Sequence, residues 1–131
     1  MTDVTRVRYL RYALVLVGLL FTAMVYVLVV ALGSSGGGRW PISQDEQMLM
    51  GVYVTLGVFL LIASRNPLQH RSLIWFTVWS SVAHAGIMTL QSINATADRS
   101  DLLRGSAAML IVAILLAVLT PRGVVTEPKK N

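Results

Sequence analysis

Residues 10–32 read LRYALVLVGLLFTAMVYVLVVAL and contain no charged side chain after Arg11. A helix of this length reaches about 35 Å, which is enough to cross a hydrocarbon core about 30 Å thick. The arginines at positions 6, 8 and 11 also suit a signal peptide, but the apolar region of a signal peptide has only about 7–15 residues. The run therefore predicts a membrane-spanning helix that stays in the protein.

Three further apolar runs follow, at residues 47–64, 73–93 and 102–120. Ser43, followed by two acidic residues, is typical of a helix N-terminus. Proline disfavours helix in the residue before it, so Pro67 and Pro121 mark the ends of the second and fourth runs. The short segment between the second and third runs predicts that these two helices form an antiparallel hairpin.

The fold class that these runs predict is all-α: a polytopic membrane protein with a four-helix antiparallel bundle. Residues 1–131 form one domain in this interpretation, and residues 121–131 are a polar tail. The composition agrees, because 13% of the residues are charged and 55% are hydrophobic, whereas a soluble domain has about 25% charged residues. A chain this short has most residues near its surface, so an apolar surface indicates a lipid environment.

The basic residues predict the orientation of the helices. The termini and residues 65–71 share one side of the membrane and carry eight of the 11 Lys and Arg residues. The positive-inside rule places this side in the cytoplasm. Because the net charge of +5 follows from this topology, we expect no nucleic-acid partner.

The run at 73–93 has polar side chains on one side of a helical wheel. With Trp75 at zero, His84 falls at about 180° and Trp79 at about 40°. The tryptophans thus face lipid, and the polar side faces the interior, where each polar group needs a partner. The polar stripe consists of Thr77, Ser80, Ser81, His84 and Gln91.

Two tyrosines on other helices are candidate partners for this stripe. Helical rise places Tyr26 and Tyr53 at the depth of Gln91, so we expect a polar pocket in the outer half of the bundle with His84 at its floor. Such a stripe is consistent with hydrogen-bonded contacts between helices. It is also consistent with a functional site, such as a proton relay or a pocket for a polar ligand.

The fourth predicted helix carries one charged residue, Arg104, near the outer end of the bundle. An ion pair with Asp98 or Asp101 explains it, and a substrate-binding arginine is the alternative. Ala113 and Ala117 give the same helix a small-residue face that allows close packing.

Catalytic, metal and cofactor sites are not expected. There are no cysteines, every acidic residue lies in a predicted loop or tail or at the margin of an apolar run, and no Ser–His–Asp set can be assembled. The two histidines, His70 and His84, lie about 20 Å apart along the helical rise, too far to bind one haem iron.

The segment from Gly51 to Leu90 resembles a family of small bacterial four-helix membrane proteins of unknown function. The specific part is the stretch from Asn66 to His84, with residues Pro67, His70, Arg71, Trp75, Trp79 and His84. It is similar, more loosely, to the DoxX-like membrane proteins. The resemblance implies the four-helix topology and a bacterial inner membrane, and it implies no catalytic role.

The sequence thus favours a small, non-enzymatic membrane protein that acts through association. It would be a homo-oligomer or an accessory subunit of a larger membrane complex, with the lipid bilayer as its surroundings. The alternative is a small transporter or proton-linked carrier that uses the polar pocket around His84.

Overall fold

The computed structural model describes residues 3–33, 43–94 and 99–121. Four helices cover nearly all of this part of the chain: α1 (Asp3–Gly33), α2 (Gln44–Ala63), α3 (Arg71–Asn94) and α4 (Arg99–Leu119). Each is long and apolar enough to cross a membrane. The all-α, four-helix prediction is therefore confirmed. The tail beyond residue 121 and Asp98 lie outside the described residues.

The helices begin before the apolar runs that predicted them. The first run begins at residue 10, but α1 begins at Asp3 and includes Arg6 and Arg8. A helix continues past the hydrocarbon as long as its backbone stays hydrogen-bonded, so hydropathy locates the membrane span and not the ends of the helix. At α2 the capping signal gives the start correctly: the Ser43 hydroxyl accepts from the Glu46 amide, and the Glu46 carboxylate accepts from the Ser43 amide.

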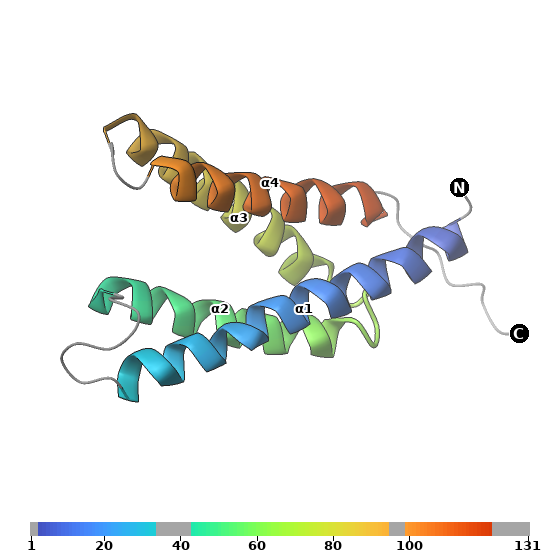
Figure 1. Cartoon of the computed structure of the whole chain (residues 1–131). Coiled ribbons are helices and arrows are strands. Elements are labelled where there is room, and N and C mark those ends of the chain that lie inside the picture. The colour runs from blue at the N-terminus through green and yellow to red at the C-terminus, as the bar shows by residue number, and fades with distance from the viewer. Residues whose placement is uncertain (1–2, 34–42, 95–98, 122–131) are drawn as a thin grey trace, which may run out of the picture.

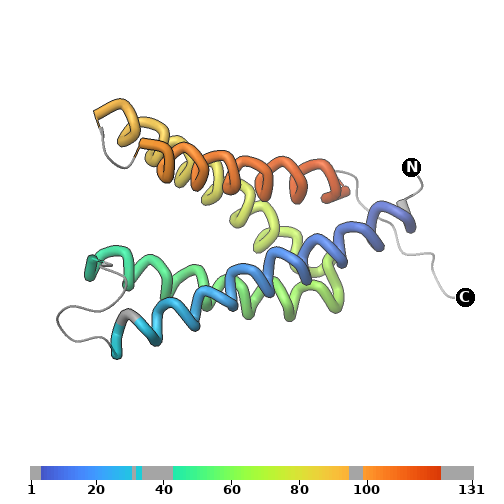
Figure 2. Tube along the Cα trace, viewed as in Figure 1, coloured from blue at the N-terminus to red at the C-terminus, as the bar shows by residue number. Residues whose placement is uncertain are grey.

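The helices pack as two pairs, α1 with α2 and α3 with α4 (Figure 1). The pairs meet at the end of the molecule that holds Asp3, the turn at residues 64–70 and Leu119, which we call the terminus end. They diverge toward the opposite end, which holds Gly33, Gln44, Asn94 and Arg99 and which we call the open end. Figure 2 shows the same divergence along the Cα trace.

The expected hairpin of the second and third helices is wrong in one respect. The turn at residues 64–70 connects them as predicted, but α2 and α3 contact each other little beyond it. A short connection keeps two helix ends together and leaves the angle between the helices free. Packing sets that angle, and here α2 packs on α1 while α3 packs on α4.

Close backbone contact explains the α1–α2 pair. Gly18 and Gly57 face each other where the two helices cross, and a Cβ atom added to Gly57 would lie 2.8 Å from the Gly18 carbonyl oxygen. The two backbones therefore approach closely at this point, beside the Thr22 and Leu61 side chains. Helices in lipid associate through such small residues, since dispersion contacts increase as backbones approach.

The core common to all four helices lies toward the terminus end. Its most deeply buried members come from every helix and have no exposed surface: Leu10, Leu14, Leu60, Ile74 and Leu116. Apolar burial against other helices is thus concentrated where the two pairs meet. Toward the open end, each pair presents more of its surface to the surroundings.

Candidate functional site

Three rings link the two helix pairs midway along the molecule. The Phe21 ring of α1 packs edge-on against the Tyr53 ring of α2, with ring centroids 5.0 Å apart. Tyr53 packs in turn against the His84 ring of α3, at a centroid distance of 5.6 Å and an interplanar angle of 73°. Edge-to-face contacts of this kind are favourable because ring faces are negative and ring edges positive. We call Phe21, Tyr53 and His84 the aromatic chain.

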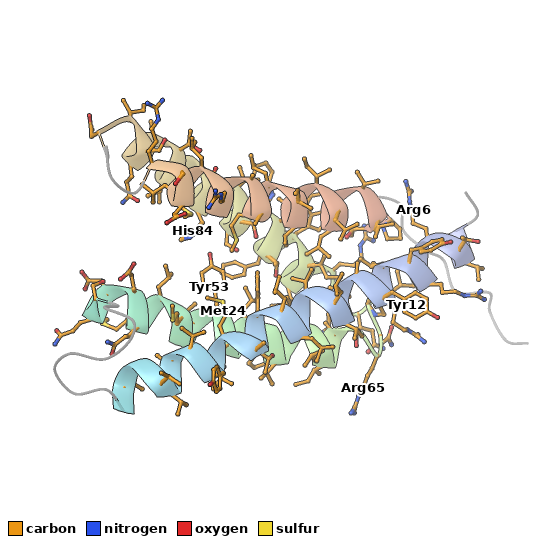
Figure 3. All side chains as sticks on the ribbon, viewed as in Figure 1. Arg6, Tyr12, Met24, Tyr53, Arg65 and His84 are labelled. Carbon is orange, nitrogen blue, oxygen red and sulfur yellow. The ribbon has the colours of Figure 1, made fainter. Side chains whose placement is uncertain are left out.

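Tyr53 is buried and His84 is half-buried. Figure 3 shows the two side chains facing each other across the space between the pairs, with Met24 of α1 beside Tyr53. No hydrogen bond joins either ring to another described residue. The Tyr53 hydroxyl and the His84 nitrogens can therefore still bind a partner.

An apolar groove of about 430 Å³ runs between α2 and the first turns of α3. Tyr53 does not line it and lies on the adjacent face of α2. The side chains that line the groove are apolar except for that of Thr55. The Thr55 hydroxyl donates to the Gly51 carbonyl oxygen of its own helix. The lining residues are Met48, Gly51, Val52, Thr55, Leu56, Phe59, Leu73 and Phe76.

Three hydroxyl groups of the predicted stripe lie on the inner side of α3. The Thr77 hydroxyl donates to the Leu73 carbonyl oxygen at 2.9 Å, and the Ser80 hydroxyl donates to the Thr77 carbonyl oxygen at 3.1 Å. Ser81 is 1% exposed, and its hydroxyl has no hydrogen-bond partner within the described part of the chain. Thr77 and Ser80 thus satisfy their hydrogen bonds within α3, and Ser81 does not.

Tyr26 and Gln91 do not join this group. Tyr26 is 74% exposed. A four-residue step turns a helical position by about 40°, so Tyr26 lies about 80° away from Gly18, which packs on α2. Gln91 is also exposed, because α3 has diverged from α2 at this height. Of the residues expected in the outer pocket, Tyr53 and His84 are the two whose side chains the structure brings into contact.

Arg104 pairs with Asp101 at 3.3 Å, and both side chains are largely exposed. This is the local i,i+3 pair considered for this arginine. An exposed pair of this kind contributes about 0–1 kcal/mol. The contact explains the position of the charge without a substrate.

The main polar contact between α3 and α4 involves Thr89, which is not a member of the predicted polar stripe. The Ser106 hydroxyl oxygen lies 2.7 Å from the Thr89 hydroxyl oxygen and 3.0 Å from the Ala85 carbonyl oxygen. Gly105, which precedes Ser106, packs so closely on the Met88 side chain that an added Cβ atom would clash with it. The small residues at the start of the fourth run were the available signal for this seam.

The charged residues are distributed unevenly between the two ends. At the open end the structure describes Asp45, Glu46 and Asp101 together with Arg99 and Arg104, and at the terminus end the first residue of α1, Asp3, is acidic. The terminus end carries arginines, and one of them, Arg11, donates to the Arg65 carbonyl oxygen at 3.4 Å. Within residues 3–33, 43–94 and 99–121, no three His, Cys, Asp or Glu side chains gather as metal ligands. The chemistry available around His84 is hydrogen bonding and proton exchange through imidazole and hydroxyl groups.

The chain belongs to a family of unknown function (DUF6632), whose family model matches residues 4–131. The prediction of an uncharacterised family is confirmed, and no similarity to DoxX-like proteins is shown. No curated protein and no solved structure matches the chain. The four long apolar helices fit a small multi-pass membrane protein.

Proposed function

We propose that the chain acts through association in the membrane, as a homo-oligomer or as an accessory subunit of a membrane complex, with no catalytic activity of its own. The observation that carries this proposal is the divergence of the two helix pairs. It leaves the apolar groove of α2 and α3 uncovered by the other helices. A helix from a second chain fits such a surface, because helices in lipid associate by packing and by hydrogen bonds.

The aromatic chain supports the same proposal. The Tyr53 hydroxyl and the His84 ring lie midway along the helices proposed to cross the membrane, without a hydrogen bond to another described residue. The transfer of a polar group without a hydrogen bond into hydrocarbon costs a free energy on the order of several kcal/mol. A polar side chain from a partner helix would remove this cost.

The groove can be tested with two matched substitutions on α2. Val52 lines the groove and Val58 does not, and both are valines exposed to the surroundings. We expect native mass spectrometry from mild detergent to detect an oligomer or a bound subunit with the wild-type chain. Val52→Trp should lower the associated fraction, and Val58→Trp should leave it unchanged. A wild-type chain that runs as a lone monomer with no bound subunit would contradict the proposal.

The proposed setting is a bacterial inner membrane, with both termini in the cytoplasm. Eight of the 11 Lys and Arg residues fall on the side of the termini and the 65–71 segment. The positive-inside rule supports this orientation.

A second candidate function is a small transporter or proton-linked carrier. The observation that favours it is a pair of buried hydroxyls without hydrogen-bond partners among the described residues, Thr22 on α1 and Ser81 on α3. Unpaired polar groups within a membrane protein are typical of ligand or proton pathways. Flux into proteoliposomes tests this candidate, and a flux that is the same in His84→Ala would exclude the histidine from the mechanism.

A further inference from the structure

Arg6 occupies an unusual position at the terminus end. It follows the spacing of the buried face of α1, on which Leu10, Ala13 and Val17 are at most 6% exposed. Arg6 is itself half-buried. Figure 3 shows it on the side of α1 toward the end of α4, whereas Arg65 points away from the bundle. No ion pair or hydrogen bond joins Arg6 to another described residue.

Arg6 lines a cavity of about 190 Å³ together with Ala117, Val118 and Thr120 of the end of α4. The Thr120 hydroxyl proton is already used, because it donates to the Leu116 carbonyl oxygen at 2.6 Å. The guanidinium group of Arg6 is therefore the donor available to a molecule in this cavity. Its planar set of N–H groups matches the oxygens of a phosphate.

The surroundings of the cavity favour an anion. Arg8, Arg11 and Arg65 lie at the same end and outnumber the acidic residues there, of which the described part of the chain has one, Asp3 at the start of α1. The Arg71 guanidinium donates to the Pro121 carbonyl oxygen, which places a further positive charge beside the last turn of α4.

An apolar track leads away from the cavity along α4. Val118 lines the cavity and is 59% exposed, and Ile114 and Ile111 are 62% and 65% exposed. Their spacing of four and three residues places them on one helix face. The track extends about 10 Å toward the open end. A molecule in the cavity can thus have a charged head on Arg6 and an apolar chain along α4.

We propose that the terminus end has a specific site for one phospholipid with an anionic headgroup. The phosphate binds the Arg6 guanidinium, and an acyl chain lies on Val118, Ile114 and Ile111. The site is independent of the proposed association, since it lies on α1 and α4 and the groove lies on α2 and α3. A lipid is favoured over free phosphate because the apolar track begins in the cavity itself.

Native mass spectrometry of the detergent-purified full chain, titrated with phosphatidylglycerol or phosphatidylcholine, tests this site. We expect a one-to-one adduct that forms at lower concentration with phosphatidylglycerol. Arg6→Gln should weaken this adduct about fivefold, the factor for a basic residue at an anionic lipid surface. Arg65→Gln removes the same charge from the same end but outside the cavity. Because salt screens an exposed charge at a distance, this variant should change the affinity for the lipid by less than about twofold.

Val118→Phe keeps every charge and fills part of the cavity, so it should weaken the adduct even if Arg6→Gln fails to fold. Equal effects of Arg6→Gln and Arg65→Gln would overturn the specific site, as would equal binding of the two lipids. Full binding by Val118→Phe would also overturn it. Displacement of the lipid by millimolar inorganic phosphate would show that free phosphate is the ligand and would overturn the lipid assignment.

Discussion

Gly57 packs so closely on Gly18 that a Cβ atom at position 57 would lie 2.8 Å from the Gly18 carbonyl oxygen. The same Cβ atom would lie 2.7 Å from the Thr22 amide nitrogen. Both neighbours are backbone atoms of α1, which cannot move aside as a flexible side chain can. The crossing of α1 and α2 therefore depends on the absence of a side chain at position 57.

Gly57→Ala should destabilise the protein by about 1–3 kcal/mol, the usual cost of overpacking a close interface. Alanine is the better helix former, so any loss of stability comes from separation of the two helices. SDS-induced unfolding in mixed micelles measures the change. Gly51→Ala is the matched control on α2, because a Cβ atom there meets nothing within 4 Å. Similar stability of the two variants would mean that the glycine contact does not hold the pair together.

The sequence predicts which segments cross the membrane but not which helices pair. Hydropathy depends on composition along one segment and identifies each helix without its neighbours. The pairing of α1 with α2 rests on Gly57, which has no hydropathy signal of its own. The predicted contact of the second and third helices came from loop length, which constrains only their connected ends.

The candidate site was predictable only in part, because the pattern of one helix carries no information about the helices beside it. The wheel of the third helix correctly separates Ser81, which is buried, from Trp79, which is 67% exposed. It gives no angle between helices, so Gln91 was expected near Tyr53 and is instead exposed. The contact of Tyr53 with His84 depends on the tilt of two helices and could not be read from either one alone.

Ser106→Ala should weaken the α3–α4 pair. The Ser106 hydroxyl contacts the Thr89 hydroxyl and the Ala85 carbonyl oxygen on the facing helix. Hydrogen bonds between membrane helices contribute about 0.6 kcal/mol on average and up to about 1.7 kcal/mol, so a loss in this range is expected in the same micelle assay. Ser80→Ala is the control, because Ser80 bonds only within α3. A larger loss for Ser80→Ala would contradict a role for Ser106 in pairing.

Tyr53 and His84 should be energetically coupled across the space between the pairs. A double-mutant cycle with Tyr53→Leu and His84→Leu should give a coupling free energy of about 0.5–1.5 kcal/mol, as for other edge-to-face ring pairs. The cycle compares the free energies of unfolding of the wild type, both single variants and the double variant. Additive losses, with no coupling, would indicate that the two rings do not contact each other in the membrane.

The Ser43 cap should stabilise the start of α2. Ser43→Ala removes the side-chain oxygen that accepts from the Glu46 amide at 3.2 Å, and the expected loss is about 0.5–2 kcal/mol. Hydrogen exchange of the first turn of α2 should become faster, because its amide groups lose an acceptor. Unchanged exchange in Ser43→Ala would show that water replaces the hydroxyl without cost.

The proposed orientation can be tested with single cysteines, because the chain has none of its own. Gln69 lies exposed in the turn at the terminus end, and Ser100 lies exposed in the first turn of α4 at the open end. If the termini are cytoplasmic, a membrane-impermeant maleimide applied from outside a bacterial inner membrane should label Ser100→Cys and not Gln69→Cys. Disruption of the membrane should then make both react, which shows that each thiol is accessible. The reverse labelling would invert the topology, and with it the side of the membrane on which the Arg6 cavity meets lipid headgroups.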